Sequence, residues 1–162
     1  MNLVPIAMLT RLLLPSMVKK KSKSCVINLS SSASTIRMEG GAGYCSSKLY
    51  DDFFSRALVY EYGYKIDFLS VKPYLVSTPL TRNITGALYI SKTDCVKGSF
   101  QALGNTEATF GDWRHSIQGE ISMTLSEWVR DKSAKGIWKW MNKSFAAIDS
   151  NYSIVKNLEK RC

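Results

Sequence analysis

Residues 25–34 read Cys-Val-Ile-Asn-Leu-Ser-Ser-Ser-Ala-Ser, a mostly apolar run that leads into a serine-rich turn. A short apolar run bounded by polar residues is typical of a buried β-strand. A glycine-rich loop follows at residues 38–43, and a long helix is predicted from Tyr44 to Tyr62. The apolar face of that helix is expected to consist of Leu49, Phe53 and Leu58. Residues 65–71 predict a second strand that ends before Pro73, so the order of elements indicates a parallel α/β sheet.

A further helix is predicted ahead of the first strand. Residues 3–18 are apolar on most sides, and we expect them to be buried against the sheet. Arg11, Pro5 and Pro15 argue against a membrane-spanning helix, which needs about 20 nearly uncharged residues. A mitochondrial presequence remains an alternative, because the stretch contains arginine and no acid.

The pattern is weaker beyond residue 77. Residues 78–90 are loop-like, residues 94–103 predict a short helix, and residues 109–116 contain a candidate edge strand. Residues 118–145 are predicted to be mainly helical, with tryptophans placed among lysines. That mixture fits a membrane interface, and it equally fits packing against a core or another subunit.

The chain of 162 residues is basic, with 22 Lys and Arg against 13 Asp and Glu and a net charge of +9. Residues 1–38 contain cations and no acid, which suits an anionic surface such as acidic lipid or a phosphate-bearing ligand. A solvated loop is the plainer interpretation of the lysines at residues 19–23. Nucleic acid is not an expected partner, because no recognition motif accompanies the charge.

Histidine and cysteine are too sparse for the common metal sites. His115 is the single histidine, and the four cysteines match neither zinc-ligand spacing nor a disulfide framework. A reducing compartment is therefore the default expectation. A serine hydrolase triad would depend on that one imidazole ring. We expect no bound metal, and we set hydrolase and metalloenzyme functions aside.

Tyr44 and Lys48 are four residues apart, so on a helix they project from one face about one turn apart. A phenol is a poor proton donor at neutral pH, and a neighbouring cation favours its ionised form. Ser31 lies thirteen residues before Tyr44, where its hydroxyl can face the start of the helix. Taken singly, each residue also has a structural interpretation, such as a turn or cap role for Ser31.

The run Asn-Leu-Ser-Ser-Ser-Ala-Ser, followed at these spacings by Tyr44 and Lys48, closely resembles the short-chain dehydrogenase/reductase family. The resemblance implies that Tyr44 protonates the carbonyl oxygen of a ketone substrate and that Ser31 polarises it. It implies that Lys48 favours the phenolate and binds the nicotinamide ribose. Asn2 falls where the family has the asparagine that holds a water in the proton relay.

The same resemblance covers the segment after the second strand. Residues 72–78, Lys-Pro-Tyr-Leu-Val-Ser-Thr, resemble the family's segment beside the nicotinamide. NADPH is the expected cofactor, and the residues implied to bind it are Tyr44, Lys48, Pro73, Val76 and Thr78. Residues 8–17 and 52–55 are similar to the membrane-bound very-long-chain 3-oxoacyl-CoA reductases and 17-beta-hydroxysteroid dehydrogenases. That branch implies a long-chain 3-oxoacyl-CoA or steroid substrate and the endoplasmic reticulum membrane.

The resemblance also implies a fold of which only a part is present. We expect the C-terminal half of a Rossmann-like doubly wound parallel sheet, with a catalytic half at residues 1–90 and a helical extension of the same domain at residues 91–162. The family's glycine-rich nucleotide-binding turn is absent, since the glycines of residues 40–43 lie just ahead of Tyr44.

An N-terminal nucleotide-binding half is therefore the expected partner, and three sources are open for it. It could be encoded upstream of this sequence, it could be a second chain, or it could be lost. The chain alone is expected to be inactive. The alternative function is a degenerate, non-catalytic fragment that serves as a structural subunit of a larger assembly, perhaps one at a membrane.

Overall fold

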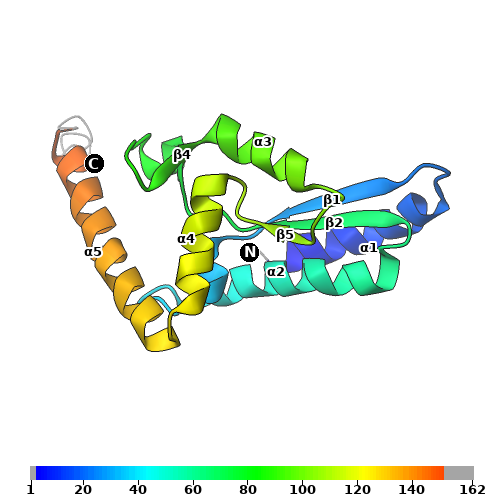
Figure 1. Ribbon diagram of the computed structural model, residues 1–162, viewed down its shortest axis with the longest axis horizontal. Coiled ribbons are helices and arrows are strands. Elements are labelled where there is room, and N and C mark those ends of the chain that lie inside the picture. Colours follow the sequence, from blue (N-terminus) through cyan, green and yellow to red (C-terminus); the bar gives the residue numbers. More distant parts are fainter. Residues whose placement is uncertain (1–2, 152–162) are drawn as a thin grey trace, which may run out of the picture.

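The computed structural model describes the backbone of residues 3–151, with side chains for residues 3–140 and 143 (Figure 1). Its centre is a sheet of three parallel strands. In order across the sheet these are β1 (Ser24–Leu29), β2 (Ile66–Val71) and β5 (Ala108–Thr109). A second, two-stranded parallel sheet consists of β3 (Leu75–Ser77) and β4 (Tyr89–Ser91). The predicted parallel α/β architecture is confirmed.

Helices lie on both sides of the central sheet. α1 (Leu3–Lys19) and α2 (Ala42–Tyr62) pack side by side on one face, below the strands in Figure 1. α3 (Lys92–Ala102) lies on the opposite side, where it contacts β3, β4 and β5. The remaining helical elements are η1 (Ser32–Thr35), η2 (Pro79–Thr81), α4 (Trp113–Thr124) and α5 (Glu127–Asn151). Chain order and packing thus give the layered arrangement of α/β proteins.

The hydrophobic core lies between the central sheet and the helix pair. Leu58 of α2 packs against Ile66 and Phe68 of β2, and all three are buried. Around them lie Leu14, Met17, Val18, Val26, Phe54, Val59 and Tyr62. β2 is buried at five of its six positions, as expected of a parallel strand covered on both faces.

α1 forms where the sequence predicts it, but it is not buried as a whole. Its sheet-facing side contributes Leu14, Met17 and Val18 to the core. Its other side exposes Val4, Met8, Leu9, Leu12 and Leu13. One sheet layer covers one face of a helix, and no described element covers the second face of α1, so the expectation of a buried helix is wrong. Among residues 3–151, no helix has both the length and the apolar character needed to cross a bilayer.

The buried face of α2 also differs from the prediction. Leu58 is buried, whereas Leu49 and Phe53 are 51% and 66% exposed. Five residues separate Phe53 from Leu58, a rotation of about 140° beyond one full turn, so the two cannot share a face. Besides Phe54 and Leu58, the sheet-facing side of α2 carries the polar residues Asp52 and Ser55, whose side chains bond to Ser70 of β2 and Asn28 of β1.

Two further expectations need correction. Residues 78–90 are not only loop, because β4 forms there and pairs with β3. Of the edge strand expected within residues 109–116, only Thr109 lies in a strand, as the last residue of β5. Asp112 already caps α4, where it accepts a hydrogen bond from the Arg114 N–H at 2.9 Å. The prediction that residues 118–145 are mainly helical is confirmed, and the helical region consists of two helices, since α4 ends at Thr124 and α5 starts at Glu127.

Candidate active site

Ser31 lies just beyond the carboxyl end of β1. It is the N-cap of η1, and its hydroxyl oxygen accepts a hydrogen bond from the Ala33 N–H at 3.2 Å. The cap role considered from the sequence is therefore real. A hydroxyl that accepts one hydrogen bond keeps its own proton to donate, so the cap leaves Ser31 able to polarise a carbonyl oxygen.

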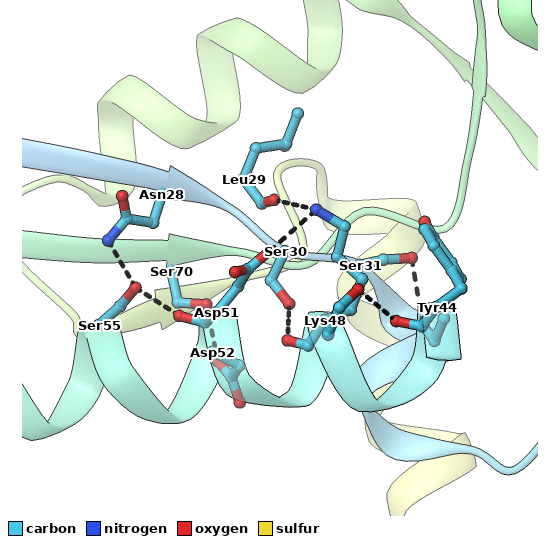
Figure 2. A network of polar contacts seen from close by, with 12 residues as sticks. Asn28, Leu29, Ser30, Ser31, Tyr44, Lys48, Asp51, Asp52, Ser55 and Ser70 are labelled. Carbon is cyan, nitrogen blue, oxygen red and sulfur yellow. Dashed lines mark hydrogen bonds and ion pairs between the residues drawn. The ribbon is translucent and has the colours of Figure 1, made fainter. Parts of the chain in front are cut away.

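Tyr44 lies in the first turn of α2, and its side chain is 45% exposed. Its backbone carbonyl accepts a hydrogen bond from the Ser47 hydroxyl at 2.8 Å. η1 packs against α2, so Ser31 and Tyr44 come from two elements in contact, at the end of the structure where β1 finishes (Figure 2). An exposed phenol at this position can meet a ligand from outside.

Lys48, one turn further along α2, is held by two partners. Its ammonium nitrogen donates to the carbonyl oxygen of Leu29 at 2.7 Å and lies 3.0 Å from a carboxylate oxygen of Asp51 (Figure 2). The ammonium and the carboxylate are largely buried. In addition, the Ser30 hydroxyl donates to the Lys48 carbonyl oxygen at 2.6 Å. These contacts fix the start of α2 against the end of β1.

A buried polar network continues along α2 beyond Lys48 and was not predicted from the sequence. Asn28 of β1 donates to the Ser55 hydroxyl at 2.8 Å, and Ser70 of β2 donates to a carboxylate oxygen of Asp52 at 2.7 Å (Figure 2). The Asp52 carboxylate also lies 3.5 Å from each of two cations, Arg56 and Lys72. The available signal was the pair of acids three and four residues after Lys48, because residues at these spacings lie on the same face of a helix as the lysine.

The segment predicted to bind the cofactor reaches the same end of the sheet. The carbonyl oxygen of Pro73 accepts a hydrogen bond from the Ser32 N–H at 3.0 Å, next to Ser31. Val76 lies in β3, and Thr78 is the N-cap of η2. Ser31, Tyr44, Lys48 and this segment are thus brought to one region, whereas Asn2 lies outside the described residues.

An open cavity of about 310 Å³ borders this region. Its lining residues are Pro5, Ile6, Ile27, Asn28, Leu29, Lys48 and Asp51. One carboxylate oxygen of Asp51 is buried and has no hydrogen-bond partner in the described part of the chain. Within that same part, no group of three or more His, Cys, Asp and Glu side chains is placed to hold a metal ion.

Comparison with known proteins identifies the family. Residues 1–88 match the family model for short chain dehydrogenase. The chain is 30% identical over 153 residues to hydroxysteroid dehydrogenase-like protein 1 of Gallus gallus, covering 91% of this chain and 44% of that protein. It is 32% identical over 146 residues to very-long-chain 3-oxoacyl-CoA reductase of Mus musculus, covering 89% and 46%. It is 30% identical over 145 residues to inactive hydroxysteroid dehydrogenase-like protein 1 of Homo sapiens, covering 86% and 41%.

The chain spans about half the length of the curated relatives it matches. A solved structure from work on 7beta-hydroxysteroid dehydrogenase stereoselectivity has a TM-score of 0.68 and 18% identity, covering 82% of this chain and 55% of that chain. At that identity the likeness shows the fold alone, and it confirms part of a Rossmann-like domain. The family match, the curated relatives and the shared fold agree with the predicted resemblance, and the chain belongs to the short-chain dehydrogenase family.

Proposed function

We propose that this chain supplies the carbonyl-reducing half of an NADPH-dependent short-chain reductase that acts on a 3-oxoacyl-CoA or a ketosteroid. The observation that supports the proposal is the Ser32–Pro73 hydrogen bond at 3.0 Å, which joins the turn after β1 to the segment after β2. It brings the surroundings of Ser31 and the proposed cofactor segment together. In open α/β sheets, ligands bind at the carboxyl ends of the strands, and this region lies there.

When bound, NADPH would supply the hydride for the carbonyl carbon, and the residues of this chain would supply the proton. Tyr44 gives its phenolic proton to the carbonyl oxygen, which turns the ketone into an alcohol. Ser31 donates a hydrogen bond to the same oxygen and stabilises the charge that develops there. Lys48 carries the positive charge that stabilises the resulting phenolate of Tyr44.

The residues present fit the nicotinamide end of the cofactor and no more. Pro73, which precedes Val76 and Thr78 in the chain, is bonded to the turn after β1 through the Ser32 N–H. A dinucleotide site also needs backbone donors at a glycine-rich turn for the pyrophosphate. No such turn occurs in these 162 residues. The proposal therefore includes a nucleotide-binding half that comes from a longer form of the chain or from a second chain.

β1 has the features needed to receive that half. Its inner side pairs with β2 along six residues, and no described strand pairs with its outer side. Ile27 and Leu29 on this strand are exposed, as is the apolar side of α1. An unpaired strand with exposed apolar side chains is a template for another strand. We accordingly place the nucleotide-binding half on the outer side of β1.

A second candidate function is a non-catalytic subunit of a larger assembly. Two observations favour it: one relative carries the name inactive hydroxysteroid dehydrogenase-like protein 1, and Ser31 and Lys48 both make structural contacts in this chain. The exposed side of α1 would then be covered by another subunit. In either case we propose attachment to a membrane, with the endoplasmic reticulum as the site that the relatives' branch favours.

The deciding experiment combines the chain with the N-terminal half of a related 3-oxoacyl-CoA reductase. NADPH binding is measured by nicotinamide fluorescence, and carbonyl reduction by the loss of absorbance of NADPH with a 3-oxoacyl-CoA and with a ketosteroid. We expect the mixture to bind NADPH and reduce one substrate class, and the chain alone to do neither. Micromolar NADPH binding by the monomeric chain would refute the need for a second half. Binding by the mixture without turnover of any ketone would favour the structural subunit.

A further inference from the structure

One peptide group near the candidate active site is held from both sides. The carbonyl oxygen of Pro73 accepts the hydrogen bond from the Ser32 N–H at 3.0 Å, and the N–H of Tyr74 donates to Nδ1 of His115 at 3.2 Å. These carbonyl and N–H groups belong to the same planar peptide, in which they point in opposite directions. The peptide therefore links η1, next to Ser31, to α4, which carries His115.

His115 is suited to this contact only in its neutral form. Nδ1 accepts a hydrogen bond, so it carries no proton, and the proton of the neutral ring is on Nε2. The side chain is completely buried. Burial lowers the pKa of His115, and it outweighs the opposing effects of the Leu88 and Phe110 carbonyls and of Asp112, while Arg114 lowers the pKa further. The neutral ring is thus the stable form at neutral pH.

Close packing holds the imidazole ring of His115 in position to accept the hydrogen bond from the Tyr74 N–H. The Tyr74 ring meets the His115 ring edge-on with centroids 5.6 Å apart, and it lies 5.7 Å from the Phe110 ring. Phe110 in turn fits against α4 at Gly119, where an added Cβ would lie 2.2 Å from the ring. Asp112 caps the same helix through the Arg114 N–H. α4 therefore has little freedom to shift relative to Tyr74.

We propose that His115 is a positioning residue for the candidate active site, acting through the Pro73–Tyr74 peptide. It holds the segment that carries Val76 and Thr78 against the turn that carries Ser31. The consequence for cofactor binding rests on the proposed function, whereas the contact with Tyr74 does not. When Nδ1 of His115 is protonated, it can no longer accept the hydrogen bond and instead presents an N–H toward the Tyr74 N–H. Acid therefore releases the segment from α4.

The first test measures hydrogen exchange at the Tyr74 amide in the full chain, resolved to single residues by fragmentation mass spectrometry. The Ser30 amide is the matched control, because it donates to the Val71 carbonyl at 2.8 Å and that acceptor does not titrate. Between pH 7.5 and pH 5, after correction for intrinsic exchange, we expect protection to fall at least 10-fold more at Tyr74 than at Ser30. Equal changes at the two amides would overturn the proposal.

Two variants separate hydrogen bonding from packing. His115→Leu fills the space but offers no acceptor, whereas His115→Asn offers a carbonyl oxygen that does not titrate. At pH 7.5 we expect the leucine variant to lose at least 10-fold protection at Tyr74, and the asparagine variant to restore part of it without pH dependence. Full protection in the leucine variant would overturn the proposal. If neither variant folds, the wild-type pH comparison decides.

The second test measures NADPH affinity in the complex with an N-terminal half. We expect His115→Leu to weaken NADPH binding at least 10-fold, and His115→Asn to recover part of the loss and to remove its dependence on pH. Unchanged affinity in the leucine variant would overturn the positioning role. If the wild-type complex binds no NADPH, the proposed function fails instead, and the exchange result at Tyr74 alone decides whether His115 holds the peptide.

Discussion

The ammonium nitrogen of Lys48 lies 2.7 Å from the carbonyl oxygen of Leu29, so the first turns of α2 are fastened to the last residue of β1. The same side chain neutralises the buried carboxylate of Asp51. The residue to which the proposed reaction assigns a charge-stabilising role therefore also maintains the shape of the site. Its substitution will change stability and chemistry together, and the two effects have to be measured separately.

Lys48→Met is expected to lower the free energy of unfolding by about 3 kcal/mol, because it leaves the buried Asp51 carboxylate without its cation. Urea denaturation followed by circular dichroism measures the change. Lys23→Met is the control, since Lys23 pairs with Asp67 at 2.6 Å but is half exposed. Exposed pairs contribute about 1 kcal/mol or less. Similar losses of unfolding free energy in the two variants would show that the buried Lys48–Asp51 pair contributes no more to stability than an exposed pair.

Tyr44→Phe is expected to reduce carbonyl reduction by about 10²- to 10⁴-fold in the complex with an N-terminal half, because it removes the proton donor. Tyr50→Phe makes the same change nearly two turns further along α2, where the ring stacks on Phe54 with centroids 5.4 Å apart. The control should keep near wild-type turnover. Steady-state kinetics with NADPH and a ketone give the comparison, and wild-type turnover by Tyr44→Phe would remove Tyr44 from the mechanism.

Gly119→Ala and Gly136→Ala place the same methyl group on two helices with opposite results. At Gly119 the new Cβ would lie 2.2 Å from the Phe110 ring, and at Gly136 nothing lies within 4 Å. We expect Gly119→Ala to destabilise the chain by about 1–3 kcal/mol through overpacking. Gly136→Ala should stabilise α5 by about 0.5–1 kcal/mol, because alanine is the better helix former. Thermal melts of both variants test the sign of each effect.

The free energy of unfolding is expected to fall as the pH drops below about 6.5, the ordinary pKa of histidine. The pKa of His115 is lowered in the folded chain by burial, so the unfolded chain binds the proton first and acid favours unfolding. His115 is the single histidine. The carboxyls with lowered pKa values, such as Asp112, whose pKa is lowered chiefly by the Arg114 guanidinium, act at lower pH. Urea denaturation between pH 7.5 and pH 5.5 should therefore show a slope in wild type that His115→Leu lacks.

The tryptophan and lysine side chains of α5 are expected to bind anionic vesicles. Trp128 is exposed, and the Lys132 ammonium lies 4.8 Å from the centre of its ring. Salt should weaken the binding only in part, because indole insertion is not screened. Co-sedimentation with vesicles of phosphatidylserine and phosphatidylcholine at low and high salt gives the measurement. Trp128→Ala should lower the salt-resistant fraction, and a chain that stays in the supernatant at low salt would contradict the expectation.

The strands and helices around the site were predictable because their signals are local. The apolar run of β1 and the spacing of Tyr44 and Lys48 on α2 are each visible within a few residues of sequence. β4 was not predicted, because Tyr89–Ser91 is a short strand that is stabilised by pairing with β3. Each residue of β4 pairs with the residue fourteen positions earlier in the sequence. The exposure of one side of α1 was equally out of reach, since it depends on which elements cover the helix.

The site itself was predictable in its reactive groups but not in its support. Ser31, Tyr44 and Lys48 follow a spacing that can be read directly from the sequence, although their catalytic roles remain predictions. Ser70 and Asp52 meet across 18 positions of sequence, and Tyr74 and His115 across 41. In neither pair does the sequence show which distant residue is the partner. Only tertiary packing brings them together, of α2 against β2 for the first pair and of α4 against the segment between β2 and β3 for the second.

No strand within residues 3–151 pairs with the outer side of β1, and this open edge makes the chain sensitive to its own concentration. The backbone groups that would accept the strand of a nucleotide-binding half are equally able to accept β1 of another copy, because strand pairing selects poorly among partners. Productive assembly and edge-to-edge aggregation therefore compete for the same hydrogen-bonding positions. If the chain is made without the proposed nucleotide-binding half, we expect chaperone capacity and synthesis rate to set how much of it persists in soluble form.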